Sequence, residues 1–169
     1  NQTGASRRVL DMMEKANSGH ARGYGADKWT QAGVDALRTL FECDLEAFFV
    51  TTGTAANSLA LSCLAQPWQA VLCHHQAHIL LDESTAPELF TGGARLVPVS
   101  RGDGKITPRH LEEHFRCAGE DVPHNVLAGA LSLTQSSEIG LVYSPGEVAD
   151  LCGAAHARAV GRQYRLVAS

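Results

Sequence analysis

Residues 50–57 read Val-Thr-Thr-Gly-Thr-Ala-Ala-Asn, and they join two contrasting patterns. The apolar and aromatic run of residues 45–51 is typical of a buried strand, and residues 54–65 have the spacing of a helix that Pro67 ends. Gly53 therefore lies at a predicted strand-to-helix turn. Helix N-termini carry unpaired N–H groups and a partial positive charge, so this turn predicts a site for a phosphate group.

The motif around Gly53 narrows the kind of ligand. It lacks the G-x-x-x-x-G-K-[ST] pattern of P-loops and the G-x-G-x-x-G pattern of dinucleotide-binding folds. A bare phosphate or a phosphorylated cofactor therefore fits better than a nucleotide. The alternative is that Thr54 only caps the helix with its hydroxyl group, and the residues alone leave both interpretations open.

Outward from this turn, strand and helix patterns alternate. We expect further strands over residues 70–73, 95–99, 126–134 and 164–168, and helices over residues 6–17, 29–42, 79–90, 107–116 and 144–159. Such alternation predicts an α/β domain with a mainly parallel sheet. In sheets of this kind, ligands bind beyond the carboxyl ends of the strands.

The composition restricts the class of protein. The 169 residues are 44% hydrophobic and 19% charged, as in a soluble globular domain or part of one. Lys and Arg number 14 against 18 Asp and Glu, dispersed along the chain, which argues against a nucleic-acid partner. No stretch approaches the roughly 18 apolar residues of a membrane span, so we expect no membrane association. The five cysteines include no C-x-x-C pair, which favours a reducing, cytoplasmic compartment.

Three histidines follow the predicted strand of residues 70–73. A metal site would use His74, His75 and His78 with Asp82 or Glu83, yet no second ligand cluster has zinc-type spacing, so we predict no metal. A second interpretation makes them ordinary loop and packing residues. In a third interpretation, the imidazole ring of His78 packs flat against a planar ligand that is held by the turn at Gly53.

Two other polar segments are candidates for the rim of a site. Residues 134–140 (TQSSEIG) directly follow a very apolar strand, which is typical of a substrate rim but also of any strand-to-helix loop. Tyr24, between Gly23 and Gly25, could hold its phenol over a site or anchor a surface loop.

Taken together, seven segments resemble the threonine aldolase family, most closely the bacterial low-specificity type. They are residues 24–27 (YGAD), 52–57 (TGTAAN), 76–79 (QAHI), 90–95 (FTGGAR), 104–105 (GK), 133–140 (LTQSSEIG) and 142–143 (VY). Their order and approximate spacing match the family. The resemblance implies part of the large domain of the aspartate-aminotransferase-like fold, a three-layer αβα arrangement that binds pyridoxal phosphate (PLP).

The resemblance also implies roles for individual residues. Gly53 and Thr54 would hold the PLP phosphate, His78 would stack on the pyridine ring, and Tyr24 would border the active site, so His78 and Tyr24 are the catalytic candidates. The intact relative would be a homo-oligomer acting on a small amino acid. It would cleave a β-hydroxy amino acid such as threonine to glycine and an aldehyde.

The sequence departs from the family pattern near its end. The family's Asp-Gly-Ala-Arg segment and Schiff-base lysine have no counterpart, because Lys15, Lys28 and Lys105 match other positions. We therefore expect a truncated, inactive fragment: one partial domain over residues 1–169, with an arm of residues 1–27 and an α/β core of about 28–169. The alternatives are a non-catalytic remnant or oligomer subunit, another PLP-dependent amino-acid lyase, or an unrelated binder of phosphorylated ligands.

Overall fold

The computed structural model describes residues 3–100, 102, 104–119, 122–158 and 165–168. The chain divides into two compact units, Asn1–Phe49 and Val50–Ser169. The predicted arm of residues 1–27 and core of residues 28–169 remain a prediction, because a division into compact units does not define an evolutionary domain.

The first unit holds two helices that the sequence predicted. Helix α1 (Arg7–Ala16) begins after Ser6, whose hydroxyl accepts a hydrogen bond from the Val9 N–H at 3.4 Å. Helix α2 (Lys28–Phe41) begins after Asp27, whose carboxylate accepts from the N–H groups of Trp29 and Thr30, each at 2.9 Å. These local caps explain why both helices start where they do.

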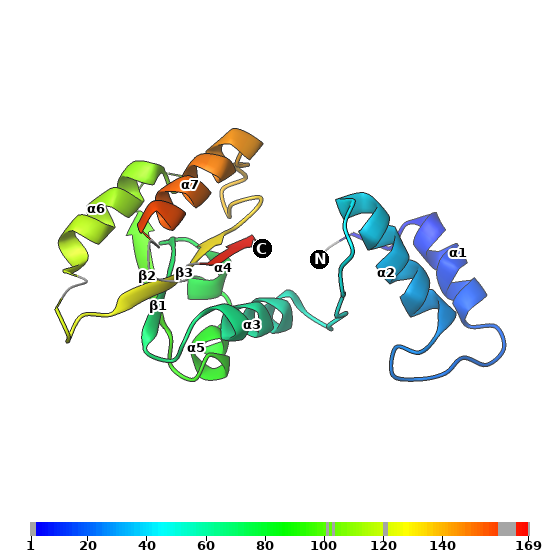
Figure 1. Cartoon of the computed structure of the whole chain (residues 1–169). Coiled ribbons are helices and arrows are strands. Elements are labelled where there is room, and N and C mark those ends of the chain that lie inside the picture. Colours follow the sequence, from blue (N-terminus) through cyan, green and yellow to red (C-terminus); the bar gives the residue numbers. More distant parts are fainter. Residues whose placement is uncertain (1–2, 101, 103, 120–121, 159–164, 169) are drawn as a thin grey trace. The chain divides into compact units, whose positions relative to one another are not determined.

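The second unit contains a parallel sheet (Figure 1). Its described strands are β1 (Gln69–His74), β2 (Arg95–Ser100), β3 (Leu127–Leu133) and β4 (Arg165–Ala168). They lie in the order β2-β1-β3-β4, and each neighbouring pair is parallel. The predicted mainly parallel sheet is confirmed. All carboxyl strand ends consequently meet at one edge, where a ligand site is expected.

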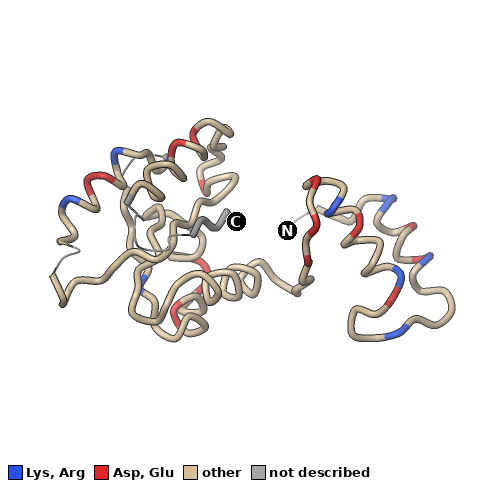
Figure 2. The backbone as a smooth tube through the Cα atoms, viewed as in Figure 1, with Lys and Arg blue, Asp and Glu red and all other residues tan. Residues whose placement is uncertain are grey.

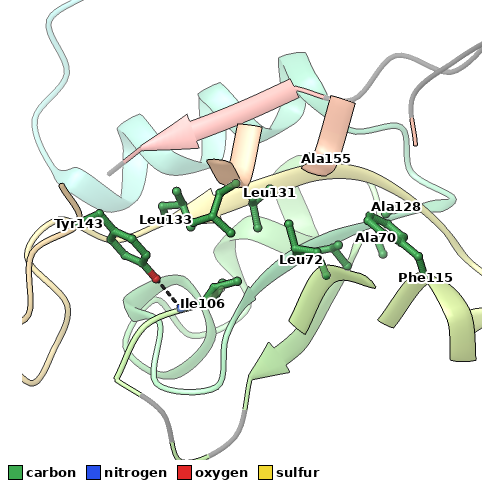
Figure 3. Packing of buried hydrophobic residues seen from close by; sticks show 11 residues of the cluster. Ala70, Leu72, Ile106, Phe115, Ala128, Leu131, Leu133, Tyr143 and Ala155 are labelled. Atoms are coloured by element: carbon green, nitrogen blue, oxygen red, sulfur yellow. Dashed lines mark hydrogen bonds between the residues drawn. The ribbon is translucent and has the colours of Figure 1, made fainter. Parts of the chain in front are cut away.

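Helices cover both faces of this sheet (Figure 1). Helices α6 (Pro108–Ala118) and α7 (Pro145–Arg158) pack on one face, and α3 (Gly53–Leu64), α4 (His78–Leu81) and α5 (Ala86–Phe90) lie on the other. Strand β1 shows the reason, because its apolar side chains alternate: Leu72 faces α6 and α7 (Figure 3), and Val71 faces α3. The expected three-layer αβα class is confirmed.

Two predicted elements differ from the structure. Residues 45–51 form no strand, and Phe48 and Phe49 are exposed. The apolar pattern indicated an extended segment, but pattern alone cannot supply a neighbouring strand to pair with. The predicted helix of residues 79–90 is split into α4 and α5 by a turn in which Ser84 has a φ of 55°. Pro87 lies in the first turn of the second helix, where proline is tolerated, whereas it would disrupt the interior of one continuous helix.

Charged residues of both signs lie on three of the described helices. Figure 2 shows Lys or Arg together with Asp or Glu on α1, α2 and α6. Exposed pairs four residues apart, Arg7 with Asp11 and Arg109 with Glu113, are part of this pattern. No helix of the described residues has the length and apolar character that a membrane crossing requires.

Candidate active site

The start of α3 has the geometry of an anion site. Thr52 is the N-cap residue, and its hydroxyl accepts from the Ala55 N–H at 3.1 Å. The interpretation that Thr54 caps the helix is therefore wrong, since Thr54 lies inside the first turn. The N–H groups of Gly53 and Thr54 precede the first helical hydrogen bond, so they are the donors that a helix leaves for a ligand. A Cβ built on Gly53 meets no atom within 4 Å, so the approach to these donors is open.

His78 is connected to α3 through a buried carboxylate. Its Nδ1 lies 2.9 Å from Oε1 of Glu83, and the same oxygen accepts from the Asn57 amide of α3 at 2.7 Å. The pKa of His78 is raised, first by this hydrogen bond and then by the nearby charges of Glu83, Glu138 and Asp82, against a lowering by burial. The structure thus joins His78 to the helix that carries Gly53 and Thr54.

The sequence patterns do not predict the two residues that connect His78 to α3. Asn57 is part of the motif of residues 52–57, and Glu83 is only one possible metal ligand in the sequence. The signal in the sequence is that Glu83 lies four residues after Ile79 in a predicted helix, and therefore on the same face as this apolar residue. A buried carboxylate requires donors, yet only the folded chain shows that Asn57 and His78 supply them.

The other two histidines lie at the carboxyl end of β1. The Nδ1 of His74 accepts from the Gln76 N–H at 3.2 Å, and the rings of His74 and His75 are 4.3 Å apart. Within the described residues, no three His, Cys, Asp or Glu side chains converge in a way that could hold a metal ion. The Nδ1 of His78 faces the Glu83 carboxylate and not the rings of His74 and His75.

A small pocket lies at the carboxyl ends of β1 and β3. Its polar lining includes His74, Gln76, Ser132, Thr134, Ser137 and Glu138. Two side chains of the loop of residues 134–143 make hydrogen bonds within the loop itself. The Gln135 side-chain amide accepts from the Tyr143 N–H at 2.6 Å and donates to the Tyr143 carbonyl at 3.2 Å, and the Ser137 hydroxyl accepts from the Leu141 N–H at 3.0 Å. Thr134 and Glu138 therefore remain the better candidates for a substrate rim.

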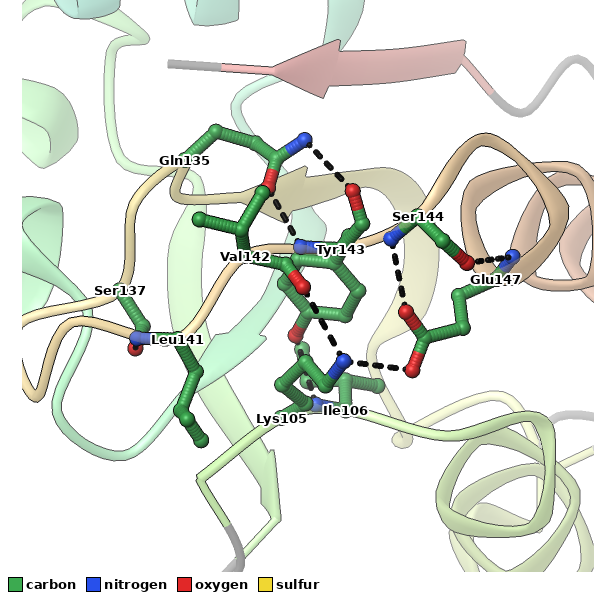
Figure 4. Close-up of polar contacts among 9 residues, drawn as sticks. All are labelled: Lys105, Ile106, Gln135, Ser137, Leu141, Val142, Tyr143, Ser144 and Glu147. Atoms are coloured by element: carbon green, nitrogen blue, oxygen red, sulfur yellow. Dashed lines mark hydrogen bonds and ion pairs between the residues drawn. The ribbon is translucent and has the colours of Figure 1, made fainter.

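Lys105 connects the end of this loop, at Val142, to Glu147 of α7 (Figure 4). Its Nζ donates to the Val142 carbonyl at 3.1 Å and to the Glu147 carboxylate at 2.5 Å. The Lys105 ammonium, followed by the Ser144 N–H, lowers the pKa of Glu147 from 4.5 to about 2. Beside it, the buried Tyr143 hydroxyl accepts from the Ile106 N–H at 2.7 Å. Lys105 is thus a structural cation.

This ion pair predicts how stability depends on pH. The pKa of Glu147 is lower in the folded chain than in the unfolded one. The ion pair with Lys105 therefore stabilises the fold fully above about pH 4.5, and this stabilisation is lost as the pH falls toward about 2. We expect Lys105→Met to destabilise the chain at neutral pH, with the difference from wild type shrinking between about pH 6 and about pH 3. Urea unfolding at both pH values measures it.

Lys15→Met removes the same charge from α1, outside this network, and is the control. Its effect on the free energy of unfolding should not change with pH in this range. A Lys105→Met effect that is equally independent of pH would contradict the assigned ion pair.

Tyr24 belongs to the first unit, whereas Gly53, Thr54 and His78 belong to the second. Its side chain is fully exposed, and its φ of 62° lies in the left-handed region that non-glycine residues rarely adopt. Such conformations occur preferentially at functional sites. Its predicted place at the border of the site remains a prediction.

The second unit is, by these features, a three-layer αβα domain with an open helix N-terminus at Gly53 and a histidine at the carboxyl edge of its sheet. The family model described as Beta-eliminating lyase matches residues 1–161, and the chain belongs to this family. The family resemblance carried by the sequence motifs is confirmed.

Individual relatives agree with this assignment. The low specificity L-threonine aldolases of Pseudomonas sp. (strain NCIMB 10558) and Pseudomonas aeruginosa are 43% and 40% identical over 148 residues, which is 88% of this chain. A solved structure described as Leishmania major threonine aldolase has a TM-score of 0.86 at 25% identity and covers 98% of this chain. A methionine aminotransferase structure from Escherichia coli, at 16% identity and a TM-score of 0.63, shares the fold.

The match covers only part of each relative. The chain spans 42% of the two Pseudomonas enzymes and 47% of the Leishmania structure.

Proposed function

We propose that this chain binds the phosphate of PLP at the start of α3, through the N–H groups of Gly53 and Thr54. The observation that carries the proposal is the open first turn of α3, where no atom would obstruct a Cβ on Gly53. An anion there would be stabilised by the helix dipole and by charge-assisted hydrogen bonds. His78, joined to the same helix through Glu83 and Asn57, would lie against the pyridine ring, and Tyr24 would border the site.

We further propose that the whole protein is a threonine-aldolase-like lyase in which this chain supplies part of the cofactor site. PLP supplies a pyridine ring that accepts the electron pair when a Cα–Cβ bond breaks. The residues of this chain would bind the phosphate, orient the ring and line the substrate side with Thr134 and Glu138. The substrate would be a β-hydroxy amino acid such as threonine, cleaved to glycine and an aldehyde by a homo-oligomer.

A cytoplasmic location belongs to the same proposal. The five cysteines, all among the described residues, form no disulfide, as expected in a reducing compartment. Burial raises the pKa of the Cys73 thiol to about 12, with a smaller contribution from Glu88, so this cysteine acts as a packing residue.

The decisive experiment adds PLP to the chain, reduces with borohydride and locates the cofactor by mass analysis. We expect weak, non-covalent binding without a stoichiometric lysine adduct, because the Lys105 ammonium is held by Glu147 and Val142. We also expect no acetaldehyde from threonine by this chain alone. A stoichiometric adduct on Lys105, or measurable aldehyde release, would contradict the proposed division of roles.

A further inference from the structure

The Glu83 carboxylate is a buried charged group with an incomplete set of hydrogen-bond donors. Its side chain has 0% solvent exposure, although it lies in a short turn between α4 and α5. Its Oε1 takes both described hydrogen bonds, from Asn57 and with His78, whereas Oε2 is buried and has no partner among the described residues. Burying a carboxylate with an incomplete set of donors costs free energy, so packing alone does not account for it.

The three residues form a chain of contacts from α3 to α4. Asn57 lies one turn into α3, and its amide donates to Glu83 at 2.7 Å. His78 is the first residue of α4, a helix of only four residues that by itself fixes a side chain poorly. The His78 side chain is 45% exposed, so one edge of the ring meets Glu83 while much of the ring stays accessible.

We propose that Asn57 and Glu83 are positioning residues for His78. Asn57 holds the Glu83 carboxylate, and Glu83 holds the Nδ1–H of His78, which fixes the orientation of the ring and makes Nε2 the nitrogen that loses its proton. The inference rests on the proposed function, in which the His78 ring lies against PLP. It adds that the carboxylate behind the ring determines how the ring is presented and which nitrogen can accept a proton.

The charged groups that act on His78 define the controls. Besides Glu83, the carboxylates of Glu138 and Asp82 raise its pKa through charge alone. Asp82→Asn therefore removes a nearby negative charge without touching the hydrogen bond. Glu83→Gln removes the charge while keeping a carbonyl oxygen of the same size that can still accept from His78.

The first test measures the ring itself, by nitrogen NMR of His78 across a pH titration without cofactor. In the wild-type chain we expect the Nδ1–H tautomer above the pKa. Glu83→Gln should lower the pKa of His78 and mix the tautomers, and Asp82→Asn should lower the pKa less and leave the tautomer unchanged. Asn57→Ser removes the amide that holds Glu83 but keeps the carboxylate itself, so it should also mix the tautomers. This second variant keeps the test decisive if Glu83→Gln does not fold.

The second test measures PLP affinity in a double-mutant cycle. Glu83→Gln should weaken binding about three-fold or more when His78 is present and have no further effect in a His78→Ala background. A His78 pKa and tautomer that do not respond to Glu83→Gln or Asn57→Ser would overturn the positioning roles. If the ring responds but the wild-type chain binds no PLP, the positioning of His78 stands and the proposed cofactor function fails.

Discussion

Gly53→Asp should weaken PLP binding by roughly 10- to 100-fold, because a carboxylate would occupy the space of the phosphate and repel it at the same helix terminus. The structure makes this substitution unusually informative. A side chain at Gly53 meets no neighbour, and an acidic residue in the first turn favours a helix, so the fold should keep or gain stability. Loss of affinity would then report the ligand site and not unfolding.

Two measurements separate the phosphate from the rest of the cofactor. Absorbance or fluorescence titration should show the loss for PLP and little change for pyridoxal, which lacks the phosphate. Gly153→Asp is the matched control, since Gly153 lies exposed in α7 and a Cβ there also meets nothing within 4 Å. Equal affinities of the Gly53→Asp and wild-type chains for PLP would refute the proposed phosphate site.

Leu111→Ala should lower the free energy of unfolding by about 2–5 kcal/mol, because it leaves a cavity between α6 and the sheet. Leu111 is 0% exposed and belongs to the core cluster that includes Leu72, Leu131 and Leu151. A small domain has about 5–15 kcal/mol of stability in total, so this loss would be a large share of it. Urea unfolding monitored by circular dichroism gives the change in midpoint.

The same substitution on the surface is the control. Leu89 in α5 is 72% exposed, and Leu89→Ala removes the same atoms from a helix without opening a cavity. We expect its effect to be within about 0.5 kcal/mol of zero. Similar losses for the two variants would mean that α6 does not pack on the sheet as the structure describes.

Sequence patterns were sufficient for the parts of this protein that local physics controls. The helix starts at Ser6 and Thr107, and the apolar strands β1 and β3, follow from capping groups and runs of apolar residues within a few positions of each other. Alternation of strands and helices then predicts the parallel sheet, because a parallel neighbour requires a crossover helix. The family resemblance came from ordered motifs in the same way.

Tertiary structure decided what depends on residues far apart in the chain. The aromatic run of residues 45–51 satisfies every local criterion for a strand, yet pairing requires a neighbour that its own sequence cannot specify. Likewise, Asn57 and Glu83 are 26 residues apart, and the partly buried hydrogen bond that links α3 to Glu83, and through it to His78, exists only once α3 and α4 pack on one face of the sheet. Hydrogen bonding of a buried carboxylate is a property of the packed chain, so this part of the site required the fold.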